Sequence, residues 1–540
     1  MKNNLAIVIC PILLIVGIFG CRSTPQVATE KPNIIFIMSD DHAYQALSCY
    51  GSQLIETPHL DRLAEEGMRF TRSFVTNSIC APSRATLLTG KYSHMNGVID
   101  NRKEFDGSQI TFPKLLQDEG YQTAMIGKWH LKSDPTGFDY WKILTGQGDY
   151  YNPDFIENGR RVRDTGYVTD LITDEVIRWI DKIDRKNPFC VLYHHKAPHR
   201  AWWPGPDHLN TFENKSFPEP VTLFDNYTDR YAAEAALMEI DSNMYLNHDL
   251  KITPENVKIG EIYPDIEQPR YESYEQKIER MTGEQREAWD QAYDGRNREF
   301  LNLGTEDKDY VRWKYQQYMR DYLRCVASVD DNVGRLMAYL EKEGLDENTL
   351  IVYTSDQGFY LGEHGWFDKR FMYEESLRMP LLIRYPKEIK PGSLNDNIVL
   401  NMDFAPTFLD YAGIEKPEQM QGQSLRRILN GDEPDNWRKA MYYHYYEYPG
   451  WHGVKRHYGI RTDRYKLIHF YYDIDRWEFY DLENDSLELH NVIDDPRYKV
   501  EIEGLKDRLE KLRSTYGDSD SLSQMYIENW IENGHTSNRF

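Results

Sequence analysis

The sequence predicts an α/β protein with a large, mostly parallel sheet and a smaller second domain. Short apolar runs alternate with charged, helix-forming segments through most of the 540 residues, which is the pattern of a buried parallel sheet. Several of these runs end directly in polar side chains, as strands do where a ligand site forms. The chain is also longer than one hydrophobic core usually covers, which favours a second domain.

Four predicted strands are the clearest elements, and each ends in residues that can do chemistry. They cover residues 33–38, 123–126, 189–193 and 350–354. The segments that follow them are Ser39-Asp40-Asp41, Gly127-Lys128-Trp129-His130, His194-His195-Lys196-Ala197-Pro198-His199 and Ser355-Asp356-Gln357-Gly358. Because ligand sites in open α/β sheets form beyond the carboxyl ends of the strands, we expect these segments to meet in one site.

Asp40, Asp41, Asp356 and Gln357 would give this site a set of hard oxygen ligands. Such a set favours Ca²⁺ or Mg²⁺ over zinc, because it contains neither thiolate nor imidazole. Two ligands from each of two strand ends would form a cage. The alternative for an Asp-Asp pair is a loop or a helix cap, so the metal assignment depends on the second pair.

Segment 78–90, Ser-Ile-Cys-Ala-Pro-Ser-Arg-Ala-Thr-Leu-Leu-Thr-Gly, carries the most specific motif. Its Cys-x-Pro-Ser-Arg run from Cys80 to Arg84, followed by Thr89-Gly90, resembles the maturation signature of the type I sulfatases. In that family the cysteine is oxidised to formylglycine, whose hydrate offers one hydroxyl to attack sulfur and a second to expel the sulfated enzyme. A lone cysteine is more often a small buried apolar residue, so the prediction for Cys80 depends on the surrounding motif.

The resemblance covers about residues 31–513 and implies an alkaline-phosphatase-like sandwich. It implies a large mixed, mostly parallel sheet and a small C-terminal α+β subdomain with an antiparallel sheet. It also implies one Ca²⁺, bound by Asp40, Asp41, Asp356, Gln357 and the oxidised Cys80. A formylglycine-generating maturation enzyme would be a partner.

The resemblance further implies a catalytic set, which consists of Cys80, Arg84, Lys128, His130, His199, Asp356 and Lys369. In this scheme Asp356 is the base for the attack on sulfur, and His199, helped by Lys369, protonates the departing sugar oxygen. Arg84 and His130 assist the release of sulfate, and Lys128 and Ca²⁺ hold the sulfuryl oxygens. Fixed cations suit this chemistry because negative charge builds on those oxygens. Positions without a family counterpart are interpreted as structural or exposed, namely His194, His195, Lys196 and Arg370.

The substrate implied by the wider motifs is a sulfated carbohydrate. Ala197-Pro198-His199 and Asp368-Lys369-Arg370 look most like glucosamine-6-sulfatases, so we expect 6-O-sulfated N-acetylglucosamine from heparan-type glycosaminoglycans. Iduronate-2-sulfatase or another glycosaminoglycan sulfatase is the alternative. We expect Trp202 and His457 to contact the sugar, since a Trp face stacks on a sugar ring and His457 lies in a Gly-flanked loop. The alternative is that Trp202 and Trp203 pack in the core and that the loop is only surface.

Two hypotheses come from other classes. One is a phosphoryl hydrolase of the same superfamily, whose metal geometry can also support phosphate chemistry. The other is a non-catalytic glycan-binding lipoprotein that kept the fold. The Cys80 motif and the presence of Arg84, Lys128 and His199 argue against both. The formal net charge of -23 makes nucleic acid an unsuitable partner, since phosphate binding needs a basic face.

The N-terminus predicts export. Lys2 is followed by an apolar run and then by Gly20-Cys21, which resembles a bacterial lipobox. We expect a signal peptide over residues 1–20, a lipidated Cys21 and a tether over residues 21–31. The mature protein would be a lipoprotein of the periplasm or outer membrane, anchored to the membrane by lipid alone. Plain secretion with cleavage nearby is the alternative.

The remaining domain boundaries follow from changes in pattern. We expect a catalytic domain over residues 32–434, with a charged helical insertion at 238–321, a C-terminal subdomain at 435–515 and a polar tail at 516–540. The subdomain contains strand-like runs at 440–444, 459–461, 466–471 and 478–482. They are followed by an amphipathic helical segment at 500–514.

Overall fold

The computed structural model describes residues 31–253, 268–303 and 308–533, without the side chains of 268–273. The predicted signal peptide, Cys21 and nearly all of the predicted tether lie outside these ranges. Residues from Pro32 onward form one compact unit. The boundary expected between residues 434 and 435 therefore stays a prediction. Within the described ranges, no helix combines the length and the apolar character needed to cross a membrane.

A ten-stranded mixed sheet forms the centre of the fold, in the order β11-β2-β10-β9-β1-β8-β4-β5-β6-β7. Its strands are β1 (Asn33–Ser39), β2 (Met68–Phe70), β4 (Gln122–Gly127), β5 (Tyr140–Leu144), β6 (Asp154–Glu157), β7 (Arg160–Arg163), β8 (Phe189–His194), β9 (Thr349–Ser355), β10 (Leu381–Arg384) and β11 (Ser393–Asn395). The neighbours β9, β1, β8, β4 and β5 are all parallel. Antiparallel pairings join β10 to β9 and β5 to β6 on either side of this block. The predicted large, mostly parallel sheet is confirmed.

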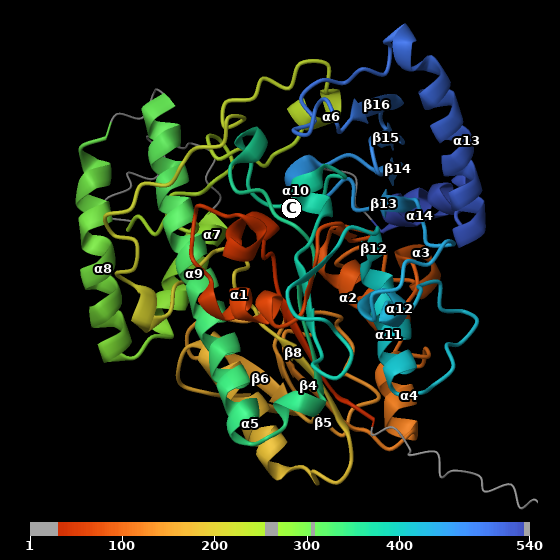
Figure 1. The fold of residues 1–540 in the computed structure, drawn as a ribbon. Helices are drawn as coiled ribbons and strands as arrows, with labels where there is room; N and C mark the ends of the chain where they lie inside the picture. The colour runs from red at the N-terminus through yellow and green to blue at the C-terminus, as the bar shows by residue number, and fades with distance from the viewer. Residues whose placement is uncertain (1–30, 254–267, 304–307, 534–540) are drawn as a thin grey trace, which may run out of the picture. The chain divides into compact units, whose positions relative to one another are not determined.

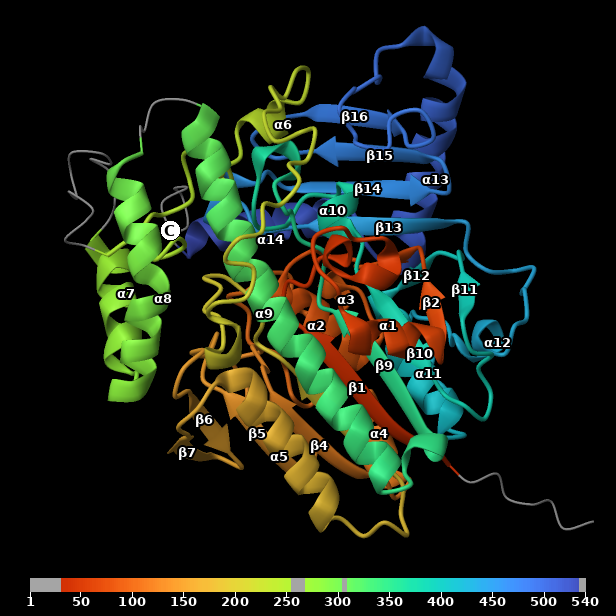
Figure 2. The same ribbon diagram turned by 60° about the vertical axis from the view of Figure 1, so that its left-hand side comes forward.

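Helices cover both faces of this sheet. On one face, the helix α9 (Lys308–Lys342) contacts both α1 (Pro58–Glu65) and α5 (Val168–Lys182), and Figure 2 shows α5 and α9 in front of the strands. The helices α2 (Cys80–Thr89), α4 (Phe112–Asp118) and α11 (Phe404–Tyr411) pack together elsewhere. Successive side chains of β1 point to opposite faces of the sheet, as strand pleating requires. Ile35 belongs to the hydrophobic cluster that contains α5 and α9, and Phe36 belongs to the cluster that contains α2 and α11.

The predicted helical insertion contains α7 (Gln268–Glu279) and α8 (Gly283–Leu301). Its expected end at residue 321 falls inside the long helix α9. Within α9, buried Asp321 accepts hydrogen bonds from Arg296 of α8 at 2.7 and 2.8 Å. Trp289 of α8 stacks on Trp203, with ring centroids 4.4 Å apart. These contacts fix α8 against the rest of the unit.

A second sheet near the C-terminus contains β13 (Ala440–Tyr445), β14 (His457–Thr462), β15 (Tyr465–Phe470) and β16 (Arg476–Asp481). All of its pairings are antiparallel, which confirms the expected small antiparallel sheet. The helix α13 (Lys499–Tyr516) packs on it (Figure 1). The segment expected as a polar tail contains α14 (Asp520–Glu532), because Ser519 caps its first turn and Ile527 and Trp530 bury one side.

The remaining elements are short. They are β3 (Ser73–Phe74), β12 (Val399–Leu400), α3 (Ser93–Asn96), α6 (Tyr231–Glu234), α10 (Glu374–Leu377) and α12 (Arg426–Leu429).

Candidate functional site

The carboxyl ends of four adjacent parallel strands meet at one edge of the main sheet. Asp40 and Asp41 follow β1, Asp356 follows β9, Lys128 follows β4 and the segment containing His199 follows β8. Backbone bonds join these ends: the amide of Asp41 donates to Oδ1 of Asp356 at 3.1 Å, and the amide of Lys128 donates to the carbonyl at the end of β8. The structure thus places these predicted segments together.

Cys80 reaches the same place from a helix N-terminus. It is the first residue of α2, all ten residues of which are buried. The Cys80 thiol donates to Oδ1 of Asp40 at 3.5 Å, and Nε2 of Gln357 lies 3.9 Å from the sulfur. Burial raises the pKa of the Cys80 thiol well above its usual range. The unmodified side chain is therefore a poor source of thiolate at neutral pH.

Cations neutralise the buried carboxylates one by one. Arg84, one turn along α2 from Cys80, donates to Oδ2 of Asp356 at 2.9 and 3.1 Å. Lys128 pairs with Asp40. Burial opposes ionisation of Asp40, yet Lys128, His199 and Arg84 together hold its pKa well below the usual value. Removing one partner from such a buried pair leaves an uncompensated charge, which costs several kcal/mol, on the order of 3–5.

The oxygen set retains capacity for a cation. Ligand atoms of Asp40, Asp41 and Asp356 lie within 4.8 Å of one another. Oδ2 of Asp41 and Oε1 of Gln357 are buried, and neither has a hydrogen-bond partner in the described part of the chain. Burial and mutual repulsion raise the pKa of Asp41 to about 6 and that of Asp356 to about 7. A hard divalent cation would remove this repulsion, so these residues fit the oxygen-coordinated metal that their chemistry predicts.

The two predicted histidines are placed differently. His199 lies beside the carboxylates, with Nε2 at 3.9 Å from Oδ2 of Asp41, and Nδ1 donates to the carbonyl of Arg200 at 2.6 Å. Burial and the nearby Lys128 lower the pKa of His199 well below its usual value. His130 is in the strained left-handed region with φ 58, and its Nδ1 has no hydrogen-bond partner among the described residues.

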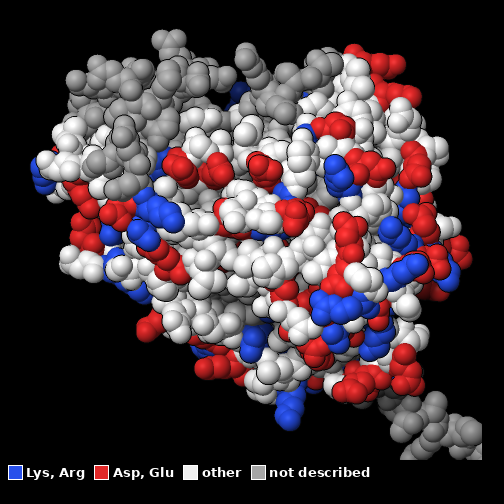
Figure 3. Space-filling model, turned by 90° about the horizontal axis from the view of Figure 1, so that it is seen from above, with Lys and Arg blue, Asp and Glu red and all other residues white. Residues whose placement is uncertain are grey.

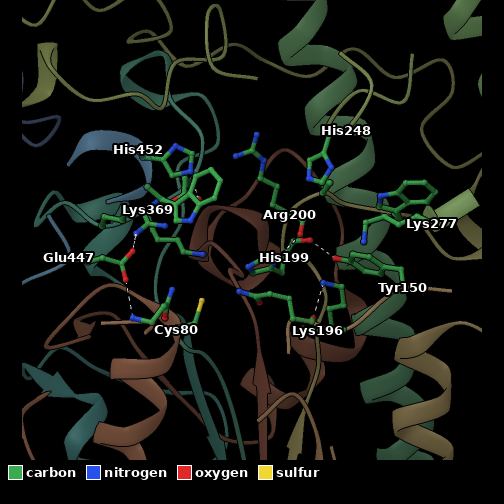
Figure 4. A pocket seen from close by; sticks show the side chains of 18 of the residues that line it. Cys80, Tyr150, Lys196, His199, Arg200, His248, Lys277, Lys369, Glu447 and His452 are labelled. Carbon is green, nitrogen blue, oxygen red and sulfur yellow. Dashed lines mark hydrogen bonds and ion pairs between the residues drawn. The ribbon is translucent and has the colours of Figure 1, made fainter. Parts of the chain in front are cut away.

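A cavity of about 510 Å³ opens beside this cluster. Figure 4 shows Cys80, Lys369 and Glu447 on one side of it and Tyr150, Lys277 and Lys196 on the other. Its volume lies in the range that small-molecule sites usually have. Lys369, which pairs with Asp41, places a cation between the carboxylates and the cavity.

The structure does not bring Trp202 and His457 to this cavity. Trp202 is fully buried, with its ring 4.5 Å from that of Tyr318, and His457 is fully buried beside Phe371. Both side chains point into the core, which removes the geometric basis for the expected sugar contacts. Nearby in sequence, Ala201, Trp203, Trp451 and His452 line the cavity instead.

Sequence reasoning also missed two cations. Lys196 and Arg370, interpreted above as structural or exposed, both line the cavity, whereas His194 and His195 are buried and do not. Arg370 donates to Asp368 at 3.0 Å and to Glu447 at 2.9 Å, and His452 lies 3.3 Å from Asp368. The position of Arg370 next to Lys369 was the available signal.

The cations that could bind an anionic ligand, such as Lys196, Lys369 and Arg370, lie inside the cavity. Figure 3 shows acidic and basic side chains interspersed over the face in view, without one large basic patch. A net charge of -23 repels anions at long range, so local cations must outweigh it at the site.

This α/β fold brings together a cluster of carboxylate and amide oxygens, a buried cysteine and several cations. Such a site is typical of a hydrolase that acts on anionic esters. The family model described as Sulfatase matches residues 32–414, and the model described as N-sulphoglucosamine sulphohydrolase, C-terminal, matches residues 362–515. The chain belongs to the sulfatase family and is a sulfuric ester hydrolase, as segment 78–90 predicted. The phosphoryl hydrolase and non-catalytic alternatives are set aside.

Relatives agree with this assignment. An N-acetylglucosamine-6-O-sulfatase of Bacteroides thetaiotaomicron is 52% identical over 526 residues, which is 96% of this chain and 93% of the relative. The human N-acetylglucosamine-6-sulfatase is 28% identical over 464 residues, 81% of this chain and 71% of the relative.

Solved structures also resemble the fold. A protein in complex with its substrate, D-glucosamine-2-N,6-O-disulfate, has a TM-score of 0.87 and 53% identity, covering 91% of this chain and 99% of that chain. A phosphonate monoester hydrolase of Agrobacterium radiobacter, at TM-score 0.64 and 21% identity over 90% of this chain and 96% of that chain, shares the fold alone. The site, rather than the fold, therefore separates sulfate from phosphonate chemistry.

Proposed function

We propose that this sulfatase removes the 6-O-sulfate from N-acetylglucosamine or N-sulfated glucosamine of heparan-type glycosaminoglycans. The observation that carries this proposal is the 52% identity, over nearly the whole chain, to an N-acetylglucosamine-6-O-sulfatase. The neighbour solved with D-glucosamine-2-N,6-O-disulfate supports the same sugar. The cavity beside Cys80 is lined by several charged side chains, which suits a sulfated sugar.

The nucleophile in this proposal is formylglycine made from Cys80. Its hydrate would supply the hydroxyl that attacks sulfur, and the second hydroxyl would allow the aldehyde to re-form. The raised pKa of the unmodified thiol supports the modification, because a buried thiol has little nucleophilic thiolate to offer. Asp356, whose pKa is raised to about 7 by burial and by Asp40, is suited to accept the proton of the attacking hydroxyl.

Asp40, Asp41, Asp356 and Gln357 would hold Ca²⁺, which supplies positive charge for the sulfuryl oxygens when bound. Lys128 pairs with Asp40 and helps to keep it ionised, and Arg84 pairs with Asp356. The same two cations stabilise negative charge that develops during transfer.

His199 and Lys369 are placed to assist the departing sugar oxygen, since both line the cavity beside Cys80. The hydrogen bond from Nδ1 of His199 to the Arg200 carbonyl fixes the ring and leaves Nε2 for proton transfer. A bound sulfate ester counters the charge of Lys128 and so favours the protonated imidazole. Lys369 would stabilise the alkoxide until it is protonated.

Sugar hydroxyls would be recognised by the cluster of Asp368, Arg370, Glu447 and His452. These side chains are hydrogen-bonded to one another and line the cavity, so their remaining donors and acceptors are fixed in direction. Trp451, which is 41% exposed and lines the cavity, offers an apolar surface to a sugar ring. It takes the role first expected of Trp202.

The test is a release assay with protein that has passed through the maturation enzyme. Defined saccharides sulfated at the 6-O, 2-O or 3-O position are incubated separately, and inorganic sulfate is measured. We expect release from 6-O-sulfated glucosamines, and none from the Cys80→Ala variant. Faster release from a 2-O-sulfated uronate would replace this proposal with the iduronate-2-sulfatase alternative.

We also propose that the chain is an exported lipoprotein carrying lipid on Cys21. The apolar run and the Gly20-Cys21 pair support this, together with the oxygen ligand set, which suits calcium-rich surroundings. Labelling cells with a fatty-acid analogue should mark the wild-type protein and leave Cys21→Ala unmarked. A soluble, unlabelled wild-type protein would favour plain secretion.

A further inference from the structure

The side of the cavity that faces Cys80 contains a buried lysine without a carboxylate partner. Lys196 is 3% exposed, and its Nζ donates to the carbonyl of Gln147 at 3.1 Å. The ammonium also lies 4.8 Å from the centre of the Tyr150 ring. In the part of the chain that the structure describes, no Asp or Glu oxygen lies within 4.0 Å of this nitrogen to form an ion pair.

Four other cations that line the cavity form ion pairs with carboxylates, unlike Lys196. The pairs are Lys369 with Asp41, Arg370 with Glu447 at 2.9 Å, Arg200 with Asp249 at 2.6 Å and Lys277 with Asp149 at 3.1 Å. A structural lysine at 3% exposure would be expected to have such a partner, because an unpaired buried charge is costly. The missing partner points to a ligand.

The chemistry of that ligand follows from the donors. An ammonium has three hydrogens, and one of those of Lys196 is used by Gln147. Burial, followed by repulsion from Lys128 and Lys277, lowers the pKa of Lys196 to about 7. An anion entering here would repay the desolvation of the ammonium and offset its repulsion by the two other lysines.

We propose that Lys196, with Lys277 beside it, binds a second sulfate group of the substrate. This inference rests on the proposed function, since the first sulfate is the one cleaved beside Cys80. Figure 4 shows Lys196 and Lys277 across the cavity from Lys369 and Cys80. A sugar with its reactive sulfate at Cys80 would then direct its other sulfate toward these lysines. The enzyme would prefer disulfated over monosulfated glucosamine.

The experiment compares two substrates, glucosamine-2-N,6-O-disulfate and N-acetylglucosamine-6-O-sulfate, with wild type and Lys196→Met. The substitution should lower kcat/KM for the disulfate at least about tenfold more than for the monosulfate, as expected for a lost charge-assisted hydrogen bond. Lys186→Met, which removes an exposed lysine from a loop that does not line the cavity, should leave the ratio of the two values unchanged. Melting temperatures of all variants establish that they fold.

A second readout does not require turnover. Affinities of both sugars and of uronate-containing disaccharides are measured by calorimetry in the Cys80→Ala background, with and without Lys196→Met. Equal losses for the two sugars would overturn the inference while leaving the proposed function intact. A loss that appears only with uronate-containing disaccharides would assign Lys196 to a carboxylate instead. If wild type releases sulfate from neither sugar, the proposed function fails, and the calorimetric comparison still decides whether Lys196 prefers the disulfate.

Discussion

The role of Trp451 can be tested by a single truncation whose size follows from its exposure. Trp451 is 41% exposed at the cavity. A tryptophan side chain has roughly 250 Å² of surface, so about 100 Å² is available to a sugar ring. Covering half to all of this area at about 25 cal/mol per Å² contributes about 1 to 2.5 kcal/mol. Trp451→Ala should therefore reduce kcat/KM on a 6-O-sulfated glucosamine roughly five- to seventyfold.

The assay compares that sugar with a small aryl sulfate, whose ring is too short to use Trp451 and the sulfate pocket at once. Tyr231→Ala, which removes a 55% exposed aromatic side chain from α6, serves as the matched control. Equal losses on both substrates would refute the reasoning, because Trp451 would then support folding or the shared sulfate pocket.

Three further outcomes are expected. Glu478→Gln should flatten the dependence of the free energy of unfolding on pH. Burial raises the pKa of Glu478 from 4.5 to about 7, so the folded state favours its protonated form. The wild type should therefore lose about 3 kcal/mol of stability as the pH rises through this range, and the variant should not. Denaturant unfolding at pH 5 and pH 8 measures this, and an unchanged pH dependence would contradict it. Arg296→Met should cost about 1.5 to 3 kcal/mol, because Asp321 loses the hydrogen bonds from Arg296 but keeps its ion pair with Lys251, whereas Arg298→Met, at an exposed pair of the same helix, should cost under about 0.5 kcal/mol. Chelation should lower the melting temperature and abolish activity, with Ca²⁺ at a hundredfold excess over its Kd restoring about 2.7 kcal/mol; a requirement for zinc would count against the oxygen site.

The strand ends were predictable because two simple rules act together there. A buried parallel strand has a continuous apolar run, and ligand sites form at its carboxyl end. The segments after β1, β4, β8 and β9 could therefore be grouped before their contacts were known. The antiparallel second sheet came from the family resemblance rather than from periodicity, and the structure confirms it.

Side-chain direction in loops was not predictable in the same way. Trp202 has φ 46 and His452 has φ 64, both in the left-handed region, so neither follows the alternation that assigns faces in a strand. The turn buries Trp202, while Trp203 and His452 face the cavity. Lys196 was missed for another reason: its segment was predicted to reach the site, but lysines are usually exposed and this one matches no family position.

The state of residue 80 tests the central claim most directly. The protein is produced with a formylglycine-generating enzyme, digested with trypsin, and the peptide that spans Cys80 is weighed while sulfate release from 6-O-sulfated glucosamine is measured on the same sample. The account predicts the mass of an aldehyde in place of the thiol, with activity proportional to the fraction converted. Full activity in protein whose residue 80 is entirely thiol would contradict it.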